Sequence, residues 1–465
     1  MAESGAKQIG QQGAPSLRRE LGVWAAVSIV VGTVIGSGIF LVPKTMVANV
    51  GSPGMVFAVW IFGGLLSLAG ALTYAELAAA LPEAGGEYVY LRAAYGRFWA
   101  FIYGWTQMWV AKSGSIATLA TAFFYYLANF YPQLEKTIAI LPLPLGSGGA
   151  PLEIRSGQLL AMAIILLLAG VNYFGVRFGG DIQVAVTIIK VLSIGGVILL
   201  GFTAPQASPE NLTTSAPSPV GGLAGFFAAL VAALWAYDGW NNVAMVSSEI
   251  KEPQRNLPRA LILGTLCVIA IYLLANAAYF LVLTSAEVAA TDRVAAEMMR
   301  RVWGNFGAGL VSLAAMISIF AALNGSILTG ARVPYAMARD GLFFPSLGRV
   351  HPRWFTPANS ILALSAWAAL LVLSGRYEQL FTYVIFASWI LYGMATASVI
   401  VLRRKQPHLA RPYRTLGYPV VPILFVLVAF ALLGSTLQNS PRESLLGIGI
   451  ILSGLPFYFY WSRKV

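Results

Sequence analysis

The chain of 465 residues is 58% hydrophobic and only 10% charged, with a mean hydropathy of +0.73 and a formal net charge of +12. A soluble domain carries about 25% charged residues, so this composition excludes a soluble globular protein and indicates an all-α membrane protein. Apolar runs of about 20 residues, each long enough to cross a bilayer, recur from Leu21 to the C-terminus. Residues 1–20 are polar, and we expect the first span itself to direct membrane insertion.

Twelve apolar segments predict twelve membrane-spanning helices, separated by loops rich in proline, glycine and charge. Their expected ranges are 21–47, 53–80, 97–130, 156–174, 182–203, 222–249, 258–284, 303–338, 358–374, 378–402, 417–435 and 443–461. An even number of spans places both termini on one side, whose segments hold 19 lysines and arginines against eight on the other side. Because positive charge favours the cytoplasmic side, we predict a multi-pass protein of the cell (inner) membrane with both termini cytoplasmic. The positive charge then reflects topology and contact with the lipid bilayer, and no nucleic-acid partner is expected.

The first span contains the sequence GTVIGSGIF at residues 32–40, with three glycines and a serine. Gly36 lies about 18 Å along the helix from Trp24, near the middle of a hydrocarbon core about 30 Å thick. One interpretation is a close helix contact, because Gly32 and Gly36 form a small-xxx-small pair. The other is an unwound segment at Gly36 to Gly38, which a membrane tolerates only inside protein or beside a cavity.

The sixth span contains a second irregular segment, WAYDGWNN at residues 235–242, with a carboxylate, a glycine and two asparagines near its middle. A charge there costs about 2.5–3.5 kcal/mol on insertion scales. Spans one and six are equivalent if the chain holds two five-helix repeats of opposite topology, and paired interruptions at matching positions are typical of a transporter site. The expected divisions are an N-terminal segment at 1–20, repeats at 21–203 and 222–402, and two further helices within 417–461.

Two interrupted helices predict a clamp for a small zwitterion. Amide ends of helices favour a carboxylate and carbonyl ends favour an ammonium group, and a free α-amino acid carries both on one carbon. We assign the carboxylate to the amides of Ser37 and Gly38, with help from the Ser37 hydroxyl. The ammonium group is assigned to four backbone carbonyls, those of Val34, Ile35, Trp235 and Ala236.

Three long segments occur in order along the chain: GTVIGSGIF, LWAYDGWNN followed by SEIKEPQRNLPRA, and ALNGSILTGARVPYAMARDGLFFPSLGRVHPRWFTP at 322–357. They resemble motifs of the amino acid–polyamine–organocation superfamily, which has the LeuT-type fold, and most closely those of the L-type amino acid transporters. The resemblance implies alternating access around a midplane site that helices one and six gate. It also implies that Trp235 is an aromatic lid over the substrate, with ordinary packing as the alternative.

Polar residues inside the expected spans each have more than one interpretation. The resemblance implies that Lys190 replaces the sodium ion of related transporters and ties the fifth helix to the first break; the alternative is a snorkelling lysine. The sequence WAYDGWN, which contains Asp238, resembles that of the subgroup that exchanges cationic and neutral amino acids. A carboxylate near the substrate favours cationic substrates. Alternatively, Asp238 pairs with Lys112 or caps free amides of the sixth helix. Gly36, Lys112 and Asn324 are expected to be coupling or structural residues.

The sequence therefore predicts a secondary active transporter, an exchanger of neutral L-amino acids, with cationic amino acids left open. A proton-coupled symporter of amino acids or polyamines and a non-transporting amino acid sensor are the alternatives. An enzyme is not expected, because the only histidines, His351 and His408, lie in predicted loops, and no expected span holds a serine–histidine pair or a metal-ligand cluster. No cofactor and no metal are expected.

A covalent partner is not expected either. The resemblance also includes heteromeric animal transporters. In these, a cysteine in the loop after helix three forms a disulfide with a heavy chain. Residues 131–155 contain no cysteine, and the single cysteine of the chain, Cys267, lies in an apolar run. We therefore predict a transporter without a disulfide-linked heavy chain.

Overall fold

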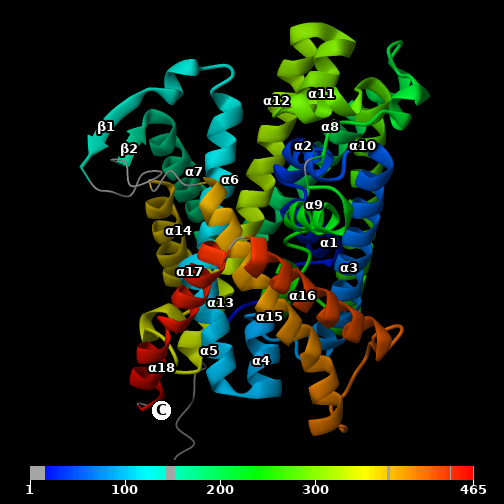
Figure 1. Cartoon of the computed structure of the whole chain (residues 1–465). Coiled ribbons are helices and arrows are strands. Elements are labelled where there is room, and N and C mark those ends of the chain that lie inside the picture. The colour runs from blue at the N-terminus through cyan, green and yellow to red at the C-terminus, as the bar shows by residue number, and fades with distance from the viewer. Residues whose placement is uncertain (1–15, 143–151, 219, 374–376, 440, 464–465) are drawn as a thin grey trace, which may run out of the picture.

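The computed structural model describes residues 16–142, 152–218, 220–373, 377–439 and 441–463. Most of them lie in helices (Figure 1). The α-helices are α1 (Val23–Val34), α2 (Gly38–Val50), α3 (Pro53–Ala80), α4 (Glu87–Tyr95), α5 (Arg97–Thr106), α6 (Lys112–Leu127), α7 (Ser156–Tyr173), α8 (Val176–Thr203), α9 (Gly222–Ala236), α10 (Pro253–Val282), α11 (Ser285–Ala290), α12 (Val294–Gly330), α13 (Arg332–Arg339), α14 (Ala358–Val372), α15 (Tyr377–Lys405), α16 (Val420–Asn439), α17 (Pro441–Leu452) and α18 (Leu455–Ser462). The other elements are the π-helix η1 (Gln107–Ala111), the 3₁₀ helices η2 (Pro132–Glu135), η4 (Pro209–Thr213), η5 (Asn242–Glu249) and η6 (Pro345–Gly348), and the strands β1 (Thr137–Leu141) and β2 (Leu152–Arg155).

The predicted spans coincide with these elements. Each of the twelve expected ranges overlaps one helix or a run of neighbouring helices. By length and composition, six of the described helices can cross a membrane, or seven if the bent pair α1 and α2 forms one span. The apolar helices α9 and α14 are shorter, with 15 residues each. The chain is thus a mostly helical membrane protein, while the count of twelve spans stays a prediction.

Several elements differ from the expected pattern. Strands β1 and β2 pair in an antiparallel hairpin, which the expected all-α class did not include. Helix α12 begins at Val294, before the expected start at 303. The prediction did not include its first turns, because they carry charges and are separated from the apolar part by a kink where Gly304 has φ +62°. The expected helix 97–130 contains the π-helical turn η1, which no local sequence pattern marked.

The helices run side by side and leave two distinct ends (Figure 1). Helix α11 and the hairpin β1–β2 lie at one end, and α4, α18 and the C-terminus lie at the other. The second is called the α4 end below. Helix η5 lies toward the α4 end, since the Gly85 amide next to α4 donates to the carbonyl of Met245, within η5, at 2.9 Å. Leu21, just before α1, pairs with Ile250 there as an isolated parallel bridge.

The broken pair α1 and α2 occupies the centre of the bundle. Helix α1 packs against α8, α10 and α12, and α2 packs against α9 and α12. Every residue from Ser28 to Val34 is buried. A stretch buried on all sides in this way is typical of an interior helix. The break between α1 and α2 is therefore enclosed by protein, as irregular backbone at membrane depth requires.

Candidate functional site

The first span is interrupted where the glycines predicted. Helix α1 ends at Val34 and α2 begins at Gly38, and the two helices are bent by 42°. Ile35 lies in an extended conformation, with φ −74° and ψ 91°. The first amides of a helix have no intrahelical acceptor, and Ser37 at the N-cap makes no side-chain cap hydrogen bond. The start of α2 therefore offers uncapped amides, which suit an anion.

The segment expected to form the sixth span is interrupted in the same way. Helix α9 ends at Ala236, residues 237–241 form turns, and the chain continues as the 3₁₀ helix η5. Gly239 has φ +108°, a conformation that side chains disfavour, and a Cβ there would lie 3.2 Å from the Thr33 hydroxyl. The Thr33 hydroxyl lies 3.0 Å from the Gly239 carbonyl. The two breaks are thus in direct contact.

The carbonyl ends of α1 and α9 converge on one side chain of α10. The Tyr272 hydroxyl lies 3.0 Å from the Val34 carbonyl and 2.7 Å from the Ala236 carbonyl. A tyrosine hydroxyl has one proton and each carbonyl has two lone pairs. Both carbonyls therefore keep acceptor capacity for a further donor such as an ammonium group. No sequence pattern indicated Tyr272, because it lies in an ordinary apolar run.

Two neighbouring helices hold the first break from the other side. The Lys190 ammonium of α8 is fully buried and donates to the carbonyls of Gly32 at 2.8 Å and Ile35 at 2.5 Å. The Ser318 hydroxyl of α12 lies 2.9 Å from the Ile35 carbonyl and 3.2 Å from that of Gly36. These contacts join α8 and α12 to the first break, while the role of Lys190 in place of a sodium ion stays a prediction. Ile35 does not line the cavity between the two breaks, and its carbonyl already accepts from Lys190, so its assignment to the substrate ammonium group stays a prediction.

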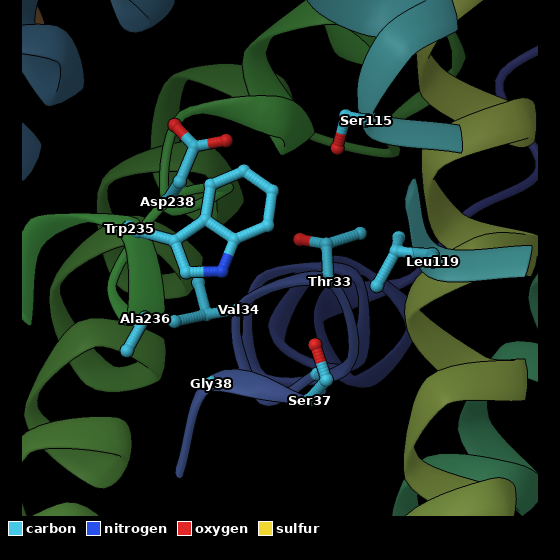
Figure 2. Close-up of a pocket in the computed structure, with 10 residues that line it drawn as sticks. Thr33, Val34, Ser37, Gly38, Ser115, Leu119, Trp235, Ala236 and Asp238 are labelled. Atoms are coloured by element: carbon cyan, nitrogen blue, oxygen red, sulfur yellow. The ribbon is translucent and has the colours of Figure 1, made fainter. Parts of the chain in front are cut away.

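A cavity lies between the two breaks and α6 (Figure 2). It encloses about 320 Å³, including its open mouth. Its lining residues are Thr33, Val34, Gly36, Ser37, Gly38, Ser115, Leu119, Trp235, Ala236 and Asp238. In Figure 2 the Trp235 ring projects between Asp238 and the first break, and Ser115 and Leu119 face it from α6. One space therefore borders both interrupted segments, which is the position that a transporter site occupies.

The cavity brings together most of the residues predicted to bind substrate. Six of the seven line it; Ile35 is the exception. Three lining residues were not predicted: Thr33, Ser115 and Leu119. Ser115 and Leu119 lie four residues apart on α6, which places them on one helix face. This spacing could have indicated both residues only if the face of α6 that is turned toward the breaks had been known.

Like Lys190, two other residues predicted for coupling or structure lie away from the cavity lining. The Asn324 amide of α12 donates to Gln183 of α8 at 2.8 Å and accepts from Asn172 of α7 at 2.9 Å. The Lys112 ammonium of α6 donates to the Asn242 side chain at 2.6 Å. Asn324 thus joins three helices, which is one of the two roles that a lone polar residue in a span can have.

Asp238 faces the cavity and is held from behind by α15. Its Oδ1 accepts a hydrogen bond of 3.0 Å from the Tyr392 hydroxyl. The ion pair with Lys112 that the sequence left open is not formed, since the Lys112 ammonium is directed to Asn242 instead. Among the described residues, no group of three or more histidine, cysteine, aspartate and glutamate side chains could hold a metal ion.

Comparisons with known proteins match almost the whole chain. The family model for amino acid permeases matches residues 21–453. The serine/threonine exchanger SteT of Bacillus subtilis is 34% identical over 451 residues, which cover 96% of this chain and 98% of that protein. The b(0,+)-type amino acid transporter 1 of Mus musculus is 32% identical, with coverages of 97% and 91%. The large neutral amino acids transporter small subunit 2 of Homo sapiens is 32% identical, with coverages of 97% and 82%.

Proposed function

Since the chain belongs to the amino acid permease family of the amino acid–polyamine–organocation superfamily, we propose that it exchanges L-amino acids across the membrane by alternating access. The substrate site is the cavity between the two interrupted helices. The family and the relatives above are transporters rather than enzymes. Neutral amino acids are the main substrates in this proposal, and Asp238 extends the range to cationic ones.

One observation carries the proposal. The uncapped amide end of α2 and the carbonyl ends of α1 and α9 border the same cavity, because Val34, Ser37, Gly38 and Ala236 all line it. A carboxylate is stabilised at the amide end and an ammonium group at the carbonyl ends. These backbone groups bind any α-amino acid alike. Selectivity then falls to the side chains that face the substituent: Ser115, Leu119, Trp235 and Asp238.

The proposal includes a topology. Twelve spans with a LeuT-type arrangement of two inverted five-helix repeats are supported by the paired interruptions in spans one and six. The α4 end is placed in the cytoplasm, because its loops carry the excess of lysine and arginine. Trp235, which lines the cavity from α9, is the lid in this arrangement. The chain acts without a disulfide-linked partner, since residues 131–155 contain no cysteine.

The test is a substrate panel on the purified chain. Thermal-shift measurements with the standard L-amino acids should raise the unfolding temperature for a subset, by mass action on the folded state. Counterflow in liposomes should then show that unlabelled members of this subset drive uptake of the labelled ones. Binding without counterflow would make the protein a sensor, and accumulation that requires a pH gradient without internal substrate would make it a proton symporter. A panel with neither binding nor counterflow would contradict the proposal.

Replacing Asp238 by asparagine is expected to reduce recognition of cationic substrates selectively. A carboxylate beside the cavity attracts a guanidinium or ammonium side chain, and its loss should raise the inhibition constant of L-arginine about tenfold while that of L-alanine changes little. The measurement is competition against counterflow of labelled alanine. Asp181→Asn is the matched control, because the Asp181 side chain is 73% exposed on α8 and should leave both constants unchanged. Equal losses for arginine and alanine would assign Asp238 a purely structural role.

A further inference from the structure

Lys112 is a buried cation that the proposed clamp does not use. It is the first residue of α6 and is only 5% exposed. Its aliphatic stem crosses Gly330 of α12, where an added Cβ would lie 2.4 Å from the Lys112 Cγ. Glycine at 330 therefore leaves the space through which the lysine reaches. A charge held inside a membrane bundle is expensive and marks a functional position.

The position of Lys112 relates it directly to the cavity. Ser115 and Leu119, which line the cavity, follow it by three and seven residues on α6, so all three share one helix face. Its ammonium group donates to the Asn242 side chain at 2.6 Å. Asn242 begins η5, and Asp238 lies in the turn just before it. Lys112 thus neighbours both the turn that carries Asp238 and the helix face that carries Ser115, although it does not line the cavity itself.

Two carboxylates act on this cation, and they differ in access. Glu87 of α4 is fully buried and accepts hydrogen bonds from the Tyr103 hydroxyl at 2.8 Å and from the Asn241 amide. Asp238 faces the cavity. The charges of both interact with Lys112, yet neither forms an ion pair with it. Asp238 therefore lines the cavity without a direct bond to Lys112, and its field in the cavity is reduced by a cation held at a fixed place.

We propose that Lys112 is a specificity-determining residue, which weakens the field of Asp238 enough for the cavity to accept neutral as well as cationic amino acids. This inference rests on the proposed function. It explains the substrate range of the transporter by the charge of a residue that does not contact the substrate. A nearby positive charge lowers the attraction between Asp238 and a cationic side chain, but it leaves the backbone clamp for the α-carboxylate and α-ammonium groups unchanged. Lys112 thus acts through Asp238 and does not bind the substrate itself.

The test uses substrate selectivity, which a merely structural role would not move. Lys112→Met removes the charge and keeps an unbranched stem that can follow the space over Gly330. Competition by L-arginine and by L-alanine against counterflow of labelled alanine gives the ratio of their inhibition constants. The ratio should shift about tenfold toward arginine, which corresponds to 1.4 kcal/mol. Lys112→Arg keeps the charge and should leave the ratio near that of the original chain.

Two further variants connect the effect to Asp238 and protect the test against misfolding. In an Asp238→Asn background, Lys112→Met should no longer change the ratio, because the field that it modulates is absent. Asn242→Asp places a carboxylate on the acceptor of Lys112 and should shift the ratio toward arginine even if Lys112→Met does not fold. Equal losses for both substrates, or a shift that persists without Asp238, would overturn the inference. Absence of counterflow by the original chain would instead contradict the proposed function.

Discussion

Gly38→Ala is expected to reduce transport about 100-fold, which is the order of loss when positioned groups move by about 1 Å. Gly38 begins α2 and lies against the end of α9: an added Cβ would be 2.7 Å from the Ala236 Cβ and 2.8 Å from its Cα. The second contact is with backbone, which cannot rotate away. Helix α2 must therefore move off α9, which separates the amide end of the clamp from its carbonyl ends. The measurement is the counterflow rate at matched amounts of reconstituted protein.

Two other glycines supply controls for this substitution. Gly54→Ala should leave transport unchanged, because nothing lies within 4 Å of an added Cβ at the start of α3. Gly36→Ala should have an intermediate effect, since its Cβ would meet the flexible Leu119 side chain at 3.3 Å. Thermal unfolding should show that Gly38→Ala loses only about 1–3 kcal/mol of stability, as overpacking usually costs. Normal transport by Gly38→Ala would show that contact between the two breaks is not needed.

The sequence predicted the broken helices well because the breaks have local causes. Three glycines within 32–38 and a charge beside Gly239 are unfavourable in a continuous membrane helix, and the structure interrupts both spans there. The residues assigned to the clamp are in the breaks themselves, so most of them line the cavity. Ile35 does not line the cavity, and the direction of its carbonyl depends on partners that the local sequence does not indicate, Lys190 and Ser318.

Contributions from intact helices could not be predicted in this way. Tyr272, Ser115 and Leu119 lie in regular helices whose sequences are compatible with ordinary packing. Their relation to the site depends on which face of α6 or α10 is turned to the breaks, and this is set by tertiary packing. The apolar pattern is weak evidence here, because helices buried among other helices are apolar all round. Arg332 is a further example: it lies within the expected span 303–338, and no sequence pattern indicates its partner.

The structure gives Arg332 a partner in Glu249, and the pair joins three segments at the α4 end. Arg332 Nε lies 2.7 Å from Glu249 Oε1, and Nη2 lies 2.8 Å from Oε2. The two side chains are 1% and 0% exposed. The Glu249 carbonyl also accepts from the amides of Glu20 and Leu21, each at 3.0 Å. The start of α1, the end of η5 and the α12–α13 junction are thereby held together on the proposed cytoplasmic side of the cavity.

Arg332→Met is therefore expected to destabilise the protein by about 3–5 kcal/mol, because it leaves the Glu249 carboxylate buried without a counter-charge. Thermal unfolding of the detergent-solubilised protein measures the loss. The double variant Arg332→Met with Glu249→Gln should recover most of it, since replacing both members of a buried pair is often nearly neutral. Arg177→Met is the matched control: its partner is Asp181 at 3.9 Å, both side chains are more than 70% exposed, and such pairs contribute about 0–1 kcal/mol.

Cysteine labelling and counterflow distinguish two roles for the Arg332–Glu249 pair: holding the α4 end closed, or stabilising the fold alone. If the pair holds the α4 end closed, the double variant should fold but open more readily on that side, which would increase labelling of a cysteine introduced at Ser28, a buried position on α1. A stable double variant with unchanged labelling and unchanged counterflow would show that the pair serves folding alone. If Arg332→Met were as stable as Arg177→Met, the expected loss of stability would be wrong. Leaving a buried carboxylate without its cation costs more free energy than leaving an exposed one.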